Sequence, residues 1–222
     1  MRGPRPRARL LALAAALAAP VLYALWIRPR LLTWGATPDE TTGPYPSDEL
    51  VPDPDGGATM ATTLPAPPER VWAWLVQMGG GRGGWYSWDW LDNDGEPSAD
   101  RIVPEWQRLE EGQQLKGPTN WWTVVMLAPS RTLVLQTAYE LPSGQGFDPR
   151  SGPPPRAYMD GIWGFHLRPA PGGRTRLVAR TRNRGRPRSF TRPFGLLLGE
   201  PVHFIMQTRQ FHNLRARVGA QV

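Results

Sequence analysis

The clearest pattern along the chain is an apolar stripe near its C-terminus. Within residues 201–218, five uncharged side chains recur at alternating spacings of three and four. This spacing places them on one face of a helix, so it predicts a long terminal helix with one buried side. The stripe consists of Phe204, Gln207, Phe211, Leu214 and Val218.

Alternation with a period of two precedes this helix and predicts β-strands. It is clearest in residues 175–184, where Leu177 and Ala179 share one side and arginines occupy the other. Runs rich in β-branched and aromatic residues predict further strands. These candidate strands are residues 59–64, 121–128, 132–139 and 161–168.

A second helical pattern covers residues 68–78, where apolar side chains recur at i, i+3, i+4 and i+7. Glycines 79–81 end it, and residues 88–93 are a candidate short helix. The order is therefore strand, helix, helix, several antiparallel strands and a long helix. That order predicts an α+β fold with helices packed on one face of an antiparallel sheet.

Residues 71–107 hold six of the eleven tryptophans of the chain. Aromatic side chains bury large areas, so this stretch either fills the core or lines an apolar pocket. Both interpretations are consistent with the sequence.

The first 30 residues are distinct from the rest. Residues 10–27 carry no charge, and arginines flank them on both sides. This length fits one short transmembrane helix, with a cleaved signal sequence as the alternative because Ala16-Leu17-Ala18 has the form of a cleavage site. Four arginines before the run and two after it favour a single-pass protein of the cell membrane with its domain outside. We therefore divide the chain into an anchor or signal (1–30), an extended linker (31–57) and a folded domain (58–222).

Charge is unevenly distributed. The linker is acidic, whereas residues 174–192 hold eight arginines and no acid. The two segments could lie against each other. The basic segment could otherwise be a solvated edge strand or contact anionic lipid headgroups, and the residues assigned to such a membrane surface are Arg176, Arg180, Arg182 and Arg184. Nucleic acid is not an expected partner because a recognition motif is missing.

Four segments resemble one uncharacterised branch of the SRPBCC superfamily, which includes START-type lipid carriers, Bet v 1-like binders and polyketide cyclase/dehydrase-like proteins. They are WGAT at 34–37, APPERVWAWLVQMG at 66–79, RGGWYSWDWLDN at 82–93 and ADRIVPEWQ at 99–107. The resemblance implies a helix-grip fold, in which an antiparallel sheet wraps around the C-terminal helix and leaves an apolar cavity. It implies no catalytic residue, because no position matches those of the catalytic cyclases.

Candidate ligand-binding residues come from the aromatic stretch, the inward faces of strands and the helical stripe. They are Trp85, Tyr86, Trp88, Arg101, Glu105, Trp106, Trp122, Trp163, Phe165, His203, Gln207 and Phe211. No cofactor or metal is expected. The chain has no cysteine, its three histidines lack a common spacing, and the acidic residues around Gly95 do not fit a calcium loop. The GGGRGG run at 79–84 lacks the ending of a phosphate-binding loop.

The sequence is compatible with three functions. The first is a membrane-tethered binder or carrier of a small hydrophobic, lipid- or polyketide-like ligand, which requires a cavity larger than about 300 Å³. The second is a cyclase, dehydratase or hydrolase in which His203 acts with Arg101 or Glu105, and it requires those side chains to converge. The third is a membrane-surface interaction module without a ligand.

Overall fold

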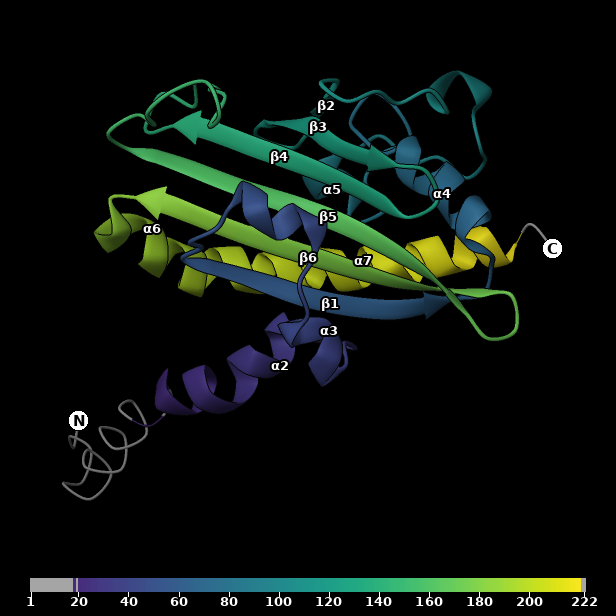
Figure 1. Cartoon of the computed structure of the whole chain (residues 1–222), viewed down its shortest axis with the longest axis horizontal. Coiled ribbons are helices and arrows are strands. Elements are labelled where there is room, and N and C mark those ends of the chain that lie inside the picture. Colours follow the sequence, from purple (N-terminus) through teal and green to yellow (C-terminus); the bar gives the residue numbers. More distant parts are fainter. Residues whose placement is uncertain (1–17, 19, 221–222) are drawn as a thin grey trace, which may run out of the picture.

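A computed structural model describes residue 18 and residues 20–220. Six antiparallel strands form one sheet in the order β1-β6-β5-β4-β3-β2 (Figure 1). The strands are β1 (Gly56–Leu64), β2 (Gln114–Lys116), β3 (Trp121–Ala128), β4 (Thr132–Glu140), β5 (Tyr158–Ala170) and β6 (Arg174–Arg186). The helices are η1 (Tyr23–Ile27), α2 (Arg28–Leu32), α3 (Pro38–Thr42), η2 (Pro46–Leu50), α4 (Pro68–Val76), α5 (Asp89–Asp92), η3 (Pro104–Trp106), α6 (Arg188–Phe194), η4 (Gly195–Gly199) and α7 (Glu200–Gly219).

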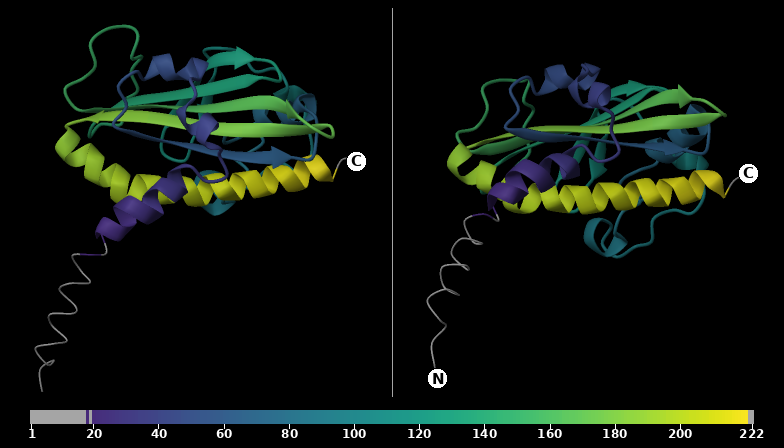
Figure 2. Two further views of the ribbon diagram at one scale, coloured as in Figure 1. Left: turned by 60° about the horizontal axis from the view of Figure 1, so that its bottom comes forward. Right: turned by 90° about the horizontal axis from the view of Figure 1, so that it is seen from below.

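The C-terminal helix runs along one face of this sheet, as Figure 2 shows. The predicted α+β class, antiparallel sheet and long terminal helix are confirmed. The helical rod is longer than predicted, because α6 and the π-helix η4 lead directly into α7. A proline removes a backbone donor and normally weakens a helix interior, yet both Pro193 and Pro201 lie within this rod. Here the wide turn of η4 lies between these two prolines.

The concave face of the sheet and α7 enclose the main hydrophobic core. Trp74, Phe165, Phe211 and Leu214 are at most 2 % exposed in this cluster. The stripe predicted on the terminal helix therefore packs inward, apart from Phe204, which is partly buried. Helix α4 contributes the apolar face that its spacing predicts, with Val71 and Leu75 fully buried.

Strand β6 lies inside the sheet, between β1 and β5. The interpretation of this arginine-rich segment as a solvated edge strand is therefore wrong. Its odd-numbered residues face the core, where Leu177 pairs with Leu167 and Ala179 pairs with Phe165. Its arginines point to the opposite, convex face and need partners there.

The segment before β1 supplies those partners. Helices α3 and η2 lie across the convex face of the sheet (Figure 1), where Tyr45 packs with Ala61 and Val178. This segment was predicted to be extended, but it contains two short helices. A capping box starts the first of them, because Thr37 and Glu40 exchange side chain–backbone hydrogen bonds. Both faces of the sheet are thus covered.

The predicted transmembrane run lies only partly within the described residues, since residues 10–17 and 19 fall outside them. Its described end continues as η1 and α2, with Val21, Leu25 and Trp26 exposed. Across residue 18 and residues 20–220, no helix has the length and apolar character needed to span a bilayer.

Candidate functional site

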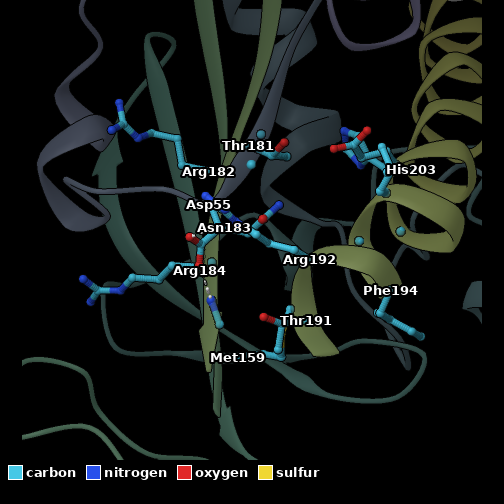
Figure 3. A pocket seen from close by; sticks show the side chains of 18 of the residues that line it. Asp55, Met159, Thr181, Arg182, Asn183, Arg184, Thr191, Arg192, Phe194 and His203 are labelled. Carbon is cyan, nitrogen blue, oxygen red and sulfur yellow. Dashed lines mark hydrogen bonds and ion pairs between the residues drawn. The ribbon is translucent and has the colours of Figure 1, made fainter. Parts of the chain in front are cut away.

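A hollow of about 740 Å³ separates the concave face of the sheet from α6, η4 and the start of α7. Figure 3 shows His203 on the helical side and Thr181 and Asn183 on the sheet side. Strands β1, β4, β5 and β6 supply the opposite wall, and Ala24 of η1 reaches its edge. The volume of the hollow lies within the range of about 300–1,000 Å³ that is typical of small-molecule sites.

The hollow exists because side chains on this part of the sheet are small. Gly56 pairs with Asn183, and Ala58 pairs with Thr181, so these small residues adjoin on the concave face. The neighbouring strand adds Gly161, which also pairs with Asn183. Larger residues fill the same face further along the strands, where Trp163 and Phe165 lie against each other with ring centroids 4.8 Å apart.

One glycine lets the helix approach the sheet closely at the end of the hollow. A Cβ atom on Gly185 would lie 2.8 Å from the Thr191 Cβ and 2.7 Å from the Met159 Sδ. Such contacts are shorter than van der Waals packing allows, so α6 fits over β6 only because residue 185 has no side chain. This contact closes the end of the hollow beside α6.

The lining is mostly apolar. Met159 and Trp122 contribute from the sheet, and Phe194, Leu196 and Leu197 contribute from the helical side. Trp122 is held in place by Trp163, whose ring centroid lies 5.7 Å away. An apolar molecule would therefore meet hydrocarbon and indole surfaces on both sides.

Three polar side chains in the lining have spare hydrogen-bonding capacity. Within the described residues, the side chains of Tyr139, Asn183 and His203 line the hollow and make no hydrogen bond to another protein group. Burial lowers the pKa of His203 to about 4 and raises the pKa of Tyr139. Both groups are therefore uncharged at neutral pH. They can exchange hydrogen bonds with a hydroxyl, carbonyl or ester, and a charged headgroup would gain no ion pair from them.

The charged residues near the hollow are paired with one another. Glu200 accepts two hydrogen bonds from Arg28 at 2.6 and 2.7 Å. Asp160, whose side chain is fully buried, accepts from Gln136 at 3.0 Å and from Arg184 at 2.9 Å. These pairs hold α2 to α7 and β5 to β6, so their evident role is structural. No three His, Asp or Glu side chains in the described part of the chain come together as metal ligands.

Most of the predicted ligand-binding residues do not line this hollow. Of the twelve, Trp122 and His203 do, and Trp163 touches both through its ring. Gln207 is occupied, because it accepts from Trp163 Nε1 at 2.9 Å and donates to Gln210 at 2.8 Å. The prediction was based on the stretch richest in aromatic residues, but those aromatic side chains pack in the core at the other end of the concave face.

The remaining predicted residues fall into two groups. Those in or beside the core are Trp85, Tyr86, Trp88, Trp106, Phe165 and Phe211. Arg101 and Glu105 are exposed on the surface and are absent from the lining. The convergence with His203 that the enzyme hypothesis required is therefore not present, since these two side chains lie outside the hollow that contains the imidazole.

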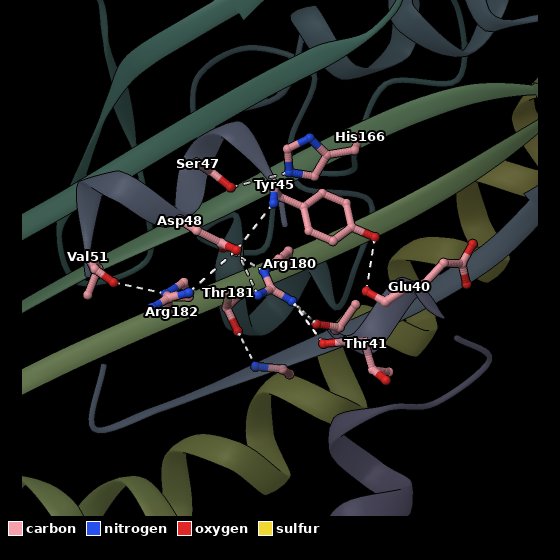
Figure 4. A network of polar contacts seen from close by, with 12 residues as sticks. Glu40, Thr41, Tyr45, Ser47, Asp48, Val51, His166, Arg180, Thr181 and Arg182 are labelled. Atoms are coloured by element: carbon pink, nitrogen blue, oxygen red, sulfur yellow. Dashed lines mark hydrogen bonds and ion pairs between the residues drawn. The ribbon is translucent and has the colours of Figure 1, made fainter. Parts of the chain in front are cut away.

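The four arginines assigned to a membrane surface are engaged on the convex face, as Figure 4 shows for two of them. Arg180 contacts Asp48 at 2.7 Å and lies over the Tyr45 ring at 4.9 Å. The other three pair in the same way: Arg176 with Glu40, Arg182 with Asp48 and Arg184 with Asp160. The predicted contact between acidic linker and basic stripe is thus present, and it leaves these arginines without the free surface that headgroup binding requires.

Sequence reasoning missed the residues that create the hollow, namely Gly56, Ala58, Gly161, Thr181, Asn183 and Gly185. A signal existed, because small residues occur at matching ends of three strands. Reading it requires the strand register, which brings these positions together on one face.

No protein-family model matches the chain, and no curated protein matches it significantly. Solved structures do match in shape. A hypothetical protein from Helicobacter pylori has a TM-score of 0.49 and 11 % identity over 78 % of this chain and 94 % of its own. A protein from Arthrobacter aurescens has a TM-score of 0.43 and 12 % identity over 74 % and 86 % of the two chains. DynU16, described as a putative protein in the dynemicin biosynthetic locus, has a TM-score of 0.41 and 16 % identity over 72 % of this chain and 48 % of its own.

The molecule is an α+β protein with a six-stranded antiparallel sheet, a long C-terminal helix and a hollow between them. The likenesses above have low identities and TM-scores below 0.5, so they give no information on activity.

Proposed function

We propose that this chain is an SRPBCC-like binder or carrier that holds one small hydrophobic molecule in the hollow between the sheet and the C-terminal helix. The observation that carries this proposal is the hollow itself, about 740 Å³ with apolar walls on both sides. The segments that resemble an SRPBCC branch support the same class of protein.

The polar groups narrow the chemical class of the ligand. His203, Asn183 and Tyr139 offer uncharged hydrogen-bonding partners, whereas the nearby carboxylates and guanidinium groups are already paired. The ligand that fits has an apolar body and an uncharged oxygen function, as in a long-chain alcohol, an ester or a polyketide-like ketone. Burying the apolar body supplies the affinity, and the polar groups orient one end.

The test uses a long-chain alcohol that carries a terminal diazirine, which inserts into nearby bonds on illumination. The full chain is labelled in lipid vesicles and the labelled peptides are mapped by mass spectrometry. We expect label on the strand segments that form the wall of the hollow, around Met159 and Asn183. A label distribution restricted to the surface would overturn the proposal.

A matched pair of variants controls for folding. Gly56→Trp places an indole in the hollow, where the new Cβ would meet only the ends of the Asn183 and Glu200 side chains at 3.2 and 3.7 Å. Gly152→Trp makes the same change in an exposed loop with no atom within 4 Å of the new Cβ. We expect the first to abolish labelling of the strands and the second to preserve it, with both chains folded by circular dichroism.

A further inference from the structure

The end of the C-terminal helix nearest the hollow exposes an unusual apolar surface. The π-helix η4 has the sequence GLLLG, and Leu197 and Leu198 are 75 % and 51 % exposed. One and two turns earlier, Phe194 and Phe190 are 48 % and 59 % exposed and their rings stack with centroids 6.2 Å apart. Clusters of large apolar side chains on a surface mark contact sites for a partner or a membrane.

A second π-helix extends this surface. In η1, Leu25 and Trp26 are 67 % and 59 % exposed. The two segments are neighbours, because Ala24 of η1 and Leu197 of η4 line the same hollow and Arg28 pairs with Glu200 at 2.6 Å. Figure 2 shows the N-terminal helix lying beside the start of the C-terminal rod. We call the exposed residues of α6, η4 and η1 the apolar face.

The chain itself indicates what covers this apolar face. Residues 10–27 form one uncharged run, and its last residues are η1. A run of this length and composition is typical of a segment that enters a bilayer. Cationic residues border the face at both ends. Arg30 is exposed just after η1, and on α6 the side chains of Arg188 and Arg192 remain 49 % and 59 % exposed although they lie 2.7 and 3.6 Å from Asp55. Arginines at the edge of an apolar helix face suit the headgroup layer of a membrane with anionic lipids.

We propose that α6 and η4 form a docking helix that lies in the surface of a lipid bilayer and holds the hollow against it. The apolar ligand can then pass between bilayer and hollow beside Phe194 and Leu197, without crossing water. The passage of ligand rests on the proposed function, whereas the docking does not.

The absence of cysteine allows a position-specific test on the full chain. A single Leu197→Cys substitution is labelled with the fluorophore NBD and reconstituted into phosphatidylcholine/phosphatidylglycerol vesicles, with or without lipids that carry a doxyl quencher in their acyl chains. Trp90→Cys is the control, because Trp90 is 73 % exposed on α5. Phe190→Cys is a second probe on the apolar face. Leu197, Phe190 and Trp90 are all exposed, so we expect labelling at these positions to leave the fold intact.

We expect the labels at Leu197 and Phe190 to shift their emission to the blue and to be quenched by the doxyl lipids, while the label at Trp90 keeps its emission in water. If the labels at Leu197 and Phe190 also remain in water, the docking proposal is overturned. Labels at Leu197 and Phe190 that are blue-shifted but unquenched would also overturn it, since a second copy of the chain or its own N-terminal segment would then cover the face. If docking fails while the diazirine probe still labels the strands, the proposed binding function stands alone.

Discussion

The ion pair between Glu40 and Arg176 joins the N-terminal segment to the convex face of the sheet, and its removal gives a quantitative prediction. Arg176 donates to both carboxylate oxygens of Glu40, at 2.8 and 2.7 Å. The carboxylate also accepts the backbone N–H of Thr37 at 2.8 Å. Its side chain is only 9 % exposed, against 22 % for Arg176. Replacing it by Glu40→Gln keeps the shape of the side chain and removes the charge.

The pKa of Glu40 gives the magnitude. The Arg176 guanidinium lowers this pKa from 4.5 to about 2. That difference corresponds to about 3 kcal/mol of folding free energy, and partial access to solvent reduces it, so we expect a loss of about 2 kcal/mol at pH 7. Because the pKa is depressed in the folded state, the stabilisation is fully present above pH 4.5 and is lost as the pH falls towards about 2.

Urea unfolding of the full chain, followed by tryptophan fluorescence, measures the effect. The control is Asp94→Asn, which removes an exposed pair with Lys116 whose side chains are 65 % and 49 % exposed. We expect that control to cost less than about 1 kcal/mol. A Glu40→Gln variant as stable as the parent at pH 7 would refute the reasoning, as would a stability difference that stays constant between pH 6 and pH 3.

Two further predictions follow from burial. Burial lowers the pKa of both His166 and His203 to about 4 from 6.5, so the free energy of unfolding should fall as the pH drops from about 6.5 to 4. His203→Gln should make this fall smaller in urea unfolding curves, and an unchanged pH dependence would contradict the lowered pKa of the imidazole. Trp85→Ala should cost about 3–5 kcal/mol, because Trp85 is 2 % exposed and stacks on Trp163. Trp90→Ala, at a 73 % exposed position, should change stability by less than about 0.5 kcal/mol, and similar losses for both variants would show that the tryptophans do not divide into core and surface as described.

The elements that could be predicted from sequence are those whose periodicity reports their burial. The stripe containing Phe211 and Leu214 and the alternation around Leu177 each reflect one buried face, and both faces are buried as expected. The acidic linker and the basic stripe were also matched by charge alone, and ion pairs such as that of Asp48 with Arg180 join them.

The position of the hollow could not be predicted, because it depends on what is missing from a face. Aromatic residues indicate that a large area is buried, but they do not show whether it lies in the core or around a pocket. Trp85 and Phe165 are packed in the core. The hollow instead follows from small residues such as Gly56 and Gly161, which become neighbours only through strand register. The placement of β6 inside the sheet was missed for a related reason: its arginines resemble a solvated edge unless the covering segment is known.

The most direct test of the hollow as a ligand site is the stoichiometry of apolar molecules that co-purify with the full chain. Mild extraction followed by native mass spectrometry counts the molecules bound to each chain in the parent and in Gly56→Trp. We predict one apolar molecule per parent chain and a clear loss in the variant, with Gly152→Trp unchanged. Equal occupancy in the parent and Gly56→Trp, or a parent chain that carries no apolar molecule, would contradict the account.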